Sequence, residues 1–216
     1  MGYSGKWKSI DQIPQRAVDE GLIDRLGTID PSDGGRTYRY SLSGDYQKQL
    51  AGGLLQTTAY AIRYYLKLYS NFTYYLDDPV NGDQFHQTDH RFVSGVKLSH
   101  RRFDRWAGRL MQNTVGVQVR SDDIGTVGLY HTRARQLLDT VRQDAVLQTS
   151  IGGYLQNEIA WTPWLRTLGG LRVDGYRFRI DASDPAKGGI DRTGIVSPKR
   201  QRHRLLLHVT VAGRAA

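Results

Sequence analysis

Apolar and polar residues alternate along several long stretches of the chain. In residues 37–47, TYRYSLSGDYQ, the tyrosines and a leucine fall at one parity, and charged or small polar residues fall at the other. A period of two is typical of a β-strand with one apolar and one polar face. The stretch exceeds the about 5–6 residues that are usual for a strand in a globular protein.

The same alternation recurs farther along the chain. We predict five more strands, in residues 59–69, 92–101, 114–120, 147–161 and 165–180. A helix would show a period of 3.6, and only residues 9–20 suit a short helix. The pattern predicts an all-β protein, an antiparallel up-and-down meander of six or seven long strands.

The predicted connections alternate in length. Short ones lie at residues 50–53, 103–108 and 162–164, and long ones at residues 70–90, 121–146 and 181–198. Outer-membrane barrels combine short periplasmic turns with longer extracellular loops, and their strands cross the hydrocarbon layer in about 9–11 residues. We therefore expect an arc of a transmembrane β-barrel. Alternation also fits a sheet whose polar face meets water, so a soluble all-β binding module and a smaller porin-like barrel remain alternatives.

Composition narrows the choice of partners. The chain has 216 residues, a net charge of +9 and no cysteine, which excludes disulfides and thiolate metal sites. Basic residues are interleaved with acidic ones, and the one dense run is KRQRHR at residues 199–204. We expect no nucleic-acid partner, because a binding face requires clustered positive charge. The N-terminus lacks the apolar core of a secretory signal.

Four segments resemble the barrel portion of TonB-dependent outer-membrane receptors. They are DQIPQRAVDEGLIDRLGTIDPSDGGRTYRYSLS (residues 11–43), NTVGVQVRSDDI (113–124), GGLRVDGYRF (169–178) and IDRTGIVSPK (190–199). The resemblance extends over residues 3–199 and lies in the ordered run of segments. It implies a part of a receptor in the bacterial outer membrane that takes up a scarce nutrient, such as a ferric siderophore. The expected partners are outer-membrane lipid, the nutrient at the extracellular mouth, and the TonB complex through a plug domain absent from this chain.

The resemblance also suggests boundaries and an orientation. We expect residues 1–36 to be an extracellular loop segment with a short helix, and residues 37–198 to be the partial barrel. Residues 199–216 form an atypical basic tail that breaks the pattern; a frameshifted or truncated reading frame would explain it, as would an unusual tail. The long connections should face the cell exterior and the short turns the periplasm. Alone, the chain is expected not to transport.

Seven charged residues are candidates for the lumen-facing side of the barrel: Arg39, Asp45, Arg63, Lys67, Glu158, Arg172 and Asp174. They would either pair across neighbouring strands or with the plug, or line a substrate route.

No catalytic motif is present. The sequence has no G-x-S-x-G, P-loop or H-E-x-x-H motif, so we predict that the protein is not an enzyme and needs no cofactor. HQTDH at residues 86–90 is interpreted as a polar loop rather than a metal site. The aspartate-rich stretches at residues 77–83 and 181–191 offer oxygen ligands of the kind that Ca²⁺ favours. They lack EF-hand spacing and are interpreted as turns.

Overall fold

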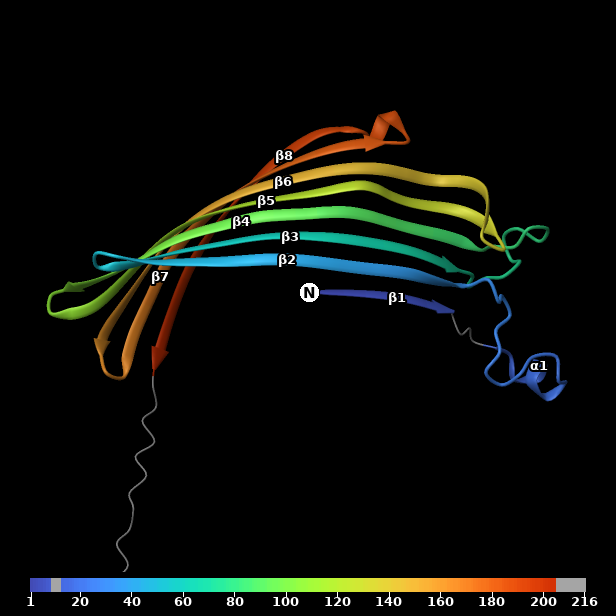
Figure 1. The fold of residues 1–216 in the computed structure, drawn as a ribbon, viewed down its shortest axis with the longest axis horizontal. Coiled ribbons are helices and arrows are strands. Elements are labelled where there is room, and N and C mark those ends of the chain that lie inside the picture. The colour runs from blue at the N-terminus through green and yellow to red at the C-terminus, as the bar shows by residue number, and fades with distance from the viewer. Residues whose placement is uncertain (9–12, 205–216) are drawn as a thin grey trace, which may run out of the picture.

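The strands form a single antiparallel sheet. The computed structural model of the protein describes residues 1–8 and 13–204. The strands are β1 (Gly2–Lys8), β2 (Gly34–Leu50), β3 (Gly53–Ser70), β4 (Phe85–Trp106), β5 (Arg109–Arg133), β6 (Gln136–Thr162), β7 (Leu165–Ala182) and β8 (Gly189–Arg204). Each pairs with the next along the chain, so the sheet order is β1 to β8 (Figure 1). The predicted all-β up-and-down meander is confirmed, with eight strands in the described residues instead of six or seven.

The three short turns lie where the sequence predicted them. They connect β2 to β3, β4 to β5, and β6 to β7. In the β4–β5 turn, Ala107 and Gly108 have φ values of 48° and 76°. Two consecutive positive φ angles define a type I′ turn, whose twist matches that of the flanking strands. We call the side of the sheet where these strand ends and turns lie the turn end.

The other connections lie at the opposite ends of the strands, which we call the loop end (Figure 1). Here the prediction of a long loop at residues 121–146 is wrong, because β5 runs to Arg133 and β6 begins at Gln136. The β5–β6 pairing contains three register shifts, between Ile124/Val127, Leu129/Tyr130 and His131/Thr132. Each irregularity changes which parity faces which side. The strands therefore continue where the period-two pattern in the sequence stops.

Other element boundaries also differ from the expected ones. Residues 1–36 contain helix α1 (Gln15–Asp19), as expected, but Gly2–Lys8 forms a strand that pairs with β2 and is not loop. Strand β8 occupies part of the expected loop at residues 181–198, which shortens that connection to the segment around the 3₁₀ helix η1 (Pro185–Lys187). The same strand continues past residue 198 into the predicted tail. Residues 205–216 of that tail lie outside the described residues.

The sheet is open, curved and one layer thick (Figure 1). Among the described residues, only Tyr69 and Val93 are buried hydrophobic side chains. The described residues form one sheet with no second sheet packed on it, unlike a sandwich of two layers about 10 Å apart. Within the described part, no helix is both long and apolar enough to cross a membrane.

Candidate functional site: the polar face of the sheet

Strand register assigns each side chain to one of two faces. Residues directly opposite each other on neighbouring strands lie on the same face, so the register carries the assignment across the sheet. One face, the apolar face, includes Leu42, Ala59, Ala61, Val96, Val117, Val119, Ile151, Val173 and Val196. The other, the polar face, includes Arg39, Asp45, Thr58, Tyr64, Arg91, Asp122, Ser150, Asp174 and Ser197.

In a water-soluble protein the polar face of a sheet is exposed and the apolar face is buried. Here the apolar face is the more exposed of the two. On the apolar face Leu42 is 78% exposed and Ile151 is 58% exposed, whereas on the polar face Asp122 is 6% and Asp174 is 8% exposed. Side chains converge on the concave side of a curved sheet, so the polar face is the concave one. An exposed apolar outside and a charged inside is the arrangement of a barrel wall in lipid.

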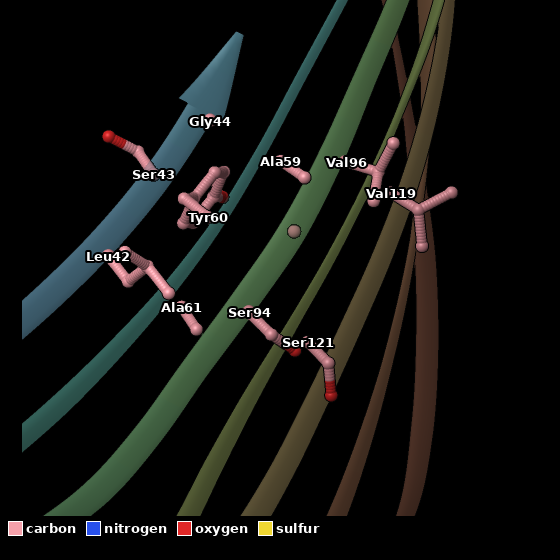
Figure 2. A pocket seen from close by; sticks show the side chains of 11 residues that line it. Leu42, Ser43, Gly44, Ala59, Tyr60, Ala61, Ser94, Val96, Val119 and Ser121 are labelled. Carbon is pink, nitrogen blue, oxygen red and sulfur yellow. The ribbon is translucent and has the colours of Figure 1, made fainter.

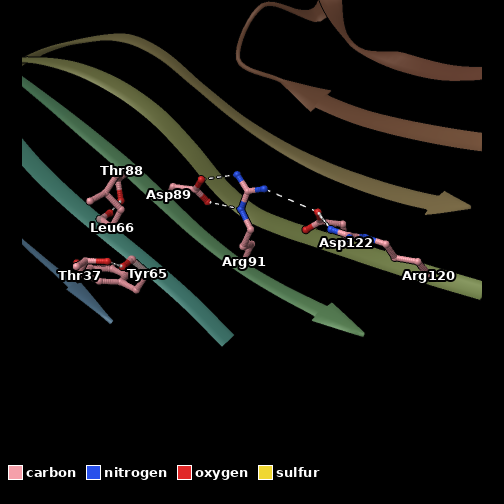
Figure 3. Close-up of polar contacts among 8 residues, drawn as sticks. All are labelled: Thr37, Tyr65, Leu66, Thr88, Asp89, Arg91, Arg120 and Asp122. Carbon is pink, nitrogen blue, oxygen red and sulfur yellow. Dashed lines mark hydrogen bonds and ion pairs between the residues drawn. The ribbon is translucent and has the colours of Figure 1, made fainter. Parts of the chain in front are cut away.

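A charge network crosses the middle of the polar face (Figure 3). The Arg91 guanidinium holds Asp89 with two hydrogen bonds and lies 3.8 Å from the Asp122 carboxylate of the next strand. Arg120 approaches the same Asp122 oxygen at 3.3 Å. Because Asp122 is buried, its charge needs such partners. The network therefore links β4 to β5 on the lumen-facing side.

A hollow of about 290 Å³ adjoins this network. Three arginines line it, Arg39 from β2, Arg91 from β4 and Arg120 from β5, together with Ile62, Tyr64, Val93 and Asp122. Guanidinium groups present fixed forks of donors that match carboxylate and phosphate oxygens. Three arginines around one hollow favour an anionic group.

A second ion pair lies on β7. Arg172 Nε donates to Asp174 Oδ2 at 2.7 Å and Arg172 Nη2 to Asp174 Oδ1 at 2.6 Å, which makes the pair bidentate. Gly152 on β6 lies directly opposite Asp174. A Cβ at Gly152 would stand 2.3 Å from Asp174 Oδ1 and 2.7 Å from Arg172 Nη2. The glycine therefore leaves the space that this pair fills.

Alanine at Gly152 is expected to displace the Arg172–Asp174 pair and to destabilise the sheet by up to about 1 kcal/mol, the usual contribution of a partly exposed ion pair, because the atoms it would meet are side-chain ends that can move. The neighbouring Gly153→Ala is the control, because it faces the other side and its Cβ would meet nothing within 4 Å. Urea unfolding of both variants in lipid vesicles measures the difference. Equal midpoints for the two variants would mean that the pair does not depend on the glycine.

The structure separates the seven predicted site residues into two groups. Five lie on the polar face: Arg39, Asp45, Glu158, Arg172 and Asp174. Asp45 accepts a 2.5 Å hydrogen bond from the Thr58 hydroxyl of β3, and Glu158 pairs with Arg166 of β7 at 3.3 Å. These two contacts join neighbouring strands, whereas the Arg172–Asp174 pair lies within one strand.

The assignment of Arg63 and Lys67 to the lumen side is wrong. Arg63 lies opposite Tyr40 and Phe92, and Lys67 lies opposite Arg36, all on the apolar face. In residues 60–69 of β3, large aromatic or aliphatic side chains occur at both parities, so hydrophobicity within this one strand cannot distinguish its faces. The register with β2 supplies the missing information.

The interpretation of HQTDH as a loop is also wrong. Residues 86–90 belong to β4, where His86 and His90 lie on the apolar face and Asp89 on the polar face. Four residues along a strand span about 13 Å, which is too far for the two histidines to share a metal. In the described residues no group of three or more His, Asp or Glu side chains is arranged to hold a metal ion.

Sequence reasoning missed a buried polar cluster at the loop end. Its centre is Gln84, which is 1% exposed. The Gln84 Nε2 amide lies 3.1 Å from Asp30 Oδ2, 2.6 Å from Ser32 Oγ and 2.8 Å from Asp33 Oδ1. Its Oε1 accepts from the Thr132 hydroxyl at 3.1 Å and from the Arg135 backbone N–H at 2.9 Å. This cluster, the Gln84 cluster, attaches the segment before β2 to the β5–β6 hairpin.

The connection between β3 and β4 is organised by one carboxylate. Desolvation would raise the pKa of Asp83, but hydrogen bonds from the backbone N–H of Asp78, the side chain of Thr73 and the backbone N–H groups of Asp77 and Leu76 lower it to about 2. The aspartates predicted to form a turn here therefore do so by accepting backbone hydrogen bonds.

The sheet and its two faces together define part of a β-barrel wall of the outer-membrane type. Residues 3–200 match the family model described as TonB dependent receptor-like, beta-barrel, and the chain belongs to this family. Members are receptors and transporters of the bacterial outer membrane rather than enzymes.

Among solved structures, the ferric citrate transporter FecA in its unliganded form is similar, with a TM-score of 0.73 and 14% sequence identity. The match covers 95% of this chain and 30% of that one, so the chain spans about 30% of the length of the transporter. At this identity the likeness concerns the fold. No curated protein matches the chain.

Proposed function

We propose that this chain forms part of the barrel wall of an outer-membrane receptor that takes up a scarce nutrient such as a ferric siderophore. In this role the nutrient arrives at the extracellular mouth, and the TonB complex acts through a plug domain inside the barrel. The observation that carries the proposal is the pair of faces: an exposed apolar face opposite a half-buried charged face, over one curved sheet.

The arginine-lined hollow supports an anionic form of that nutrient. Arg39, Arg91 and Arg120 come from three strands, and Asp89 and Asp122 together offset the charge of two of them, which leaves that of Arg39. A chelate that exposes carboxylate oxygens would find donors there without having to displace a buried apolar contact. The similar structure is that of a ferric citrate transporter, which is consistent with this class of ligand.

We further propose that the loop end faces the cell exterior and the turn end the periplasm. At the loop end lie α1, the β3–β4 connection, the β5–β6 hairpin tip and η1, whereas the connections between described strands at the turn end are tight turns (Figure 1). This asymmetry is the one found in bacterial outer-membrane barrels. The hairpin formed by β5 and β6 extends the loop end, because these strands of 25 and 27 residues exceed the about 9–11 needed to cross the membrane.

Whole-cell labelling of the intact receptor barrel tests the proposal. The chain has no cysteine, so single cysteines can be introduced without background. Val80→Cys, at a side chain that is 73% exposed in the β3–β4 connection, should react with an impermeant thiol reagent, and Ala51→Cys at the turn end should not. A bulky reagent at Val80 should also slow uptake of a radiolabelled ferric siderophore, because it stands at the entrance.

The opposite labelling pattern would reverse the orientation. Labelling of both sites in intact cells, or of neither, would contradict insertion of the sheet in the outer membrane. Uptake that is unchanged after complete labelling of Val80→Cys would separate this part of the barrel from the entry route.

A further inference from the structure

Positive charges on the apolar face form an unexpected row. Lys6 of β1 lies directly opposite Arg36 of β2, and Arg36 lies directly opposite Lys67 of β3. We call these three residues the cationic row. Like charges directly opposite one another destabilise a sheet, so the arrangement calls for an anion to offset it.

No protein group supplies that anion in the described part of the chain. The cationic row and the nearby Arg63 form no ion pair with any described residue, and Lys67 Nζ instead lies 5.5 Å from the Tyr69 ring. On the polar face, in contrast, four arginines each lie beside an aspartate: Arg91, Arg120, Arg142 and Arg172. The polar-face cations Lys97 and Lys199 also form no ion pair with a described residue, but neither lies directly opposite another cation. The row of like charges therefore distinguishes the apolar face.

A second pair of like charges repeats the arrangement across the sheet. Arg177 of β7 lies directly opposite Arg192 of β8, again on the apolar face and on the loop-end side of Val173 and Val196. Neither arginine has an ion-pair partner among the described residues. Both groups of cations thus lie between the loop end and the apolar belt, the part of the apolar face that contains Leu42, Val96, Val119, Ile151, Val173 and Val196.

Aromatic side chains lie between the cationic row and the apolar belt. Tyr38 stacks on Tyr65 with ring centroids 5.1 Å apart, and Tyr38 also contacts Tyr40 at 5.4 Å. Aromatic rings of this kind gather at the level of the lipid headgroups in membrane barrels. The cations therefore lie at the height at which headgroup phosphates are found.

A hollow on the same face lies at a depth that suits an acyl chain. It has a volume of about 590 Å³, and its lining includes the small residues Gly44, Ala59, Ala61 and Ser94 (Figure 2). From Arg36 to Leu42 at its rim, six residues rise about 20 Å along the strand. With the usual strand tilt of about 40°, this is about 15 Å of depth, half of the hydrocarbon layer of about 30 Å.

We propose that the cationic row binds the phosphate of an anionic membrane lipid, whose acyl chain runs down the apolar face into this hollow. The lipid offsets the repulsion among Lys6, Arg36 and Lys67, and Arg63 lies along its path. The proposal rests on the proposed function, because it requires the apolar face to meet lipid.

The test uses the full chain in phosphatidylcholine vesicles that contain a spin-labelled lipid, either phosphatidylglycerol or phosphatidylcholine. Electron spin resonance measures the fraction of each label that the protein immobilises, and hence the preference for the anionic headgroup. A cation near an anionic headgroup contributes about 1 kcal/mol, or roughly five-fold in association. The triple variant Lys6→Gln, Arg36→Gln, Lys67→Gln should therefore lose at least ten-fold in its preference for phosphatidylglycerol.

The matched control removes three charges from the opposite face: Lys97→Gln, Arg105→Gln and Lys199→Gln. It should keep the preference of the unaltered chain. Equal losses in the two triple variants would mean that only net charge matters, which would overturn the site. Inorganic phosphate should weaken the preference no more than chloride at equal ionic strength; stronger competition would assign the row to free phosphate instead.

The failure of this inference differs from the failure of the proposed function. If neither spin-labelled lipid is immobilised, the apolar face does not meet lipid and the barrel assignment fails. If both are immobilised equally by the unaltered chain, the barrel assignment stands and only the phosphate site is overturned.

Discussion

Arginine in place of Val117 is expected to destabilise the sheet in a bilayer by about 2–4 kcal/mol, the cost measured for a cation at the midplane of the lipid-facing side. Val117 lies on the apolar face between Val115 and Val119, and it pairs with Leu98 and Gly153. None of these neighbours has a polar or acidic side chain that could offset a positive charge. The guanidinium would have to remain in hydrocarbon or draw water and headgroups toward itself.

The control for this variant is the next residue. Gln118→Arg introduces the same side chain at the same depth, but on the polar face, where Gln118 lies opposite Lys97 and Gly152. It should change stability by less than about 1 kcal/mol, since a wet lumen accepts charge and the like charge of Lys97 opposite it costs no more than that. Urea unfolding of the chain in vesicles, followed by tryptophan fluorescence, gives the two free energies of unfolding. Similar losses for both variants would show that neither face is in contact with lipid.

Much of the architecture was predictable because it depends on local alternation. The strands at residues 37–47, 92–101 and 147–161 lie inside β2, β4 and β6, and the three tight turns lie where strand patterns end. In a one-layer sheet each strand meets the same two environments on its two sides. The sequence of one strand is therefore enough to identify it.

Assigning faces across the sheet required the structure. Tyrosines of β3 occur at both parities, and the apolar face of this strand is filled by Ala59 and Ala61, which carry little hydrophobic signal. Only the pairing of Ala61 with Leu42 and of Ala59 with Val96 shows that these alanines face outward. Arg63 and Lys67 were consequently placed on the wrong side, although their neighbours on β2 and β4 assign them clearly.

Irregular pairing limited the prediction in a different way. In β5, the step from Ile124 to Val127 shifts the register with β6, so the parity that faces the lumen changes along one strand. The alternation in the sequence stops at this step, as it would at the start of a loop. The Gln84 cluster was equally invisible, because its members Asp30, Gln84 and Arg135 are separated by about fifty residues each and meet only when the strands pair.

Leucine in place of Gln84 is expected to detach the segment before β2 from the loop end. Leucine keeps much of the volume of glutamine but removes every hydrogen bond of the Gln84 side chain, while the Gln84 carbonyl oxygen still accepts from Thr132. The carboxylate of Asp33, which is 1% exposed, would lose this partner, and so would the N–H of Arg135. The loss of hydrogen bonds around a buried polar group costs about 1–3 kcal/mol.

The loss should be local, because the cluster lies outside the paired part of β2 to β4. We expect the amide protons of Asp33 and Arg135 to exchange with solvent at least about thirty-fold faster in Gln84→Leu, the rate equivalent of 2 kcal/mol. Amides in the middle of β4 should keep their protection.

The control is Gln87→Leu, the same change three residues farther along the chain, at an exposed side chain of β4. If Gln87→Leu accelerates exchange at Arg135 as much as Gln84→Leu does, the hydrogen bonds of Gln84 do not hold the loop end together. If neither variant does, the segment before β2 is held by other contacts, of which the hydrogen bond from Arg135 Nε to the Ser32 carbonyl oxygen at 2.5 Å is the first to examine.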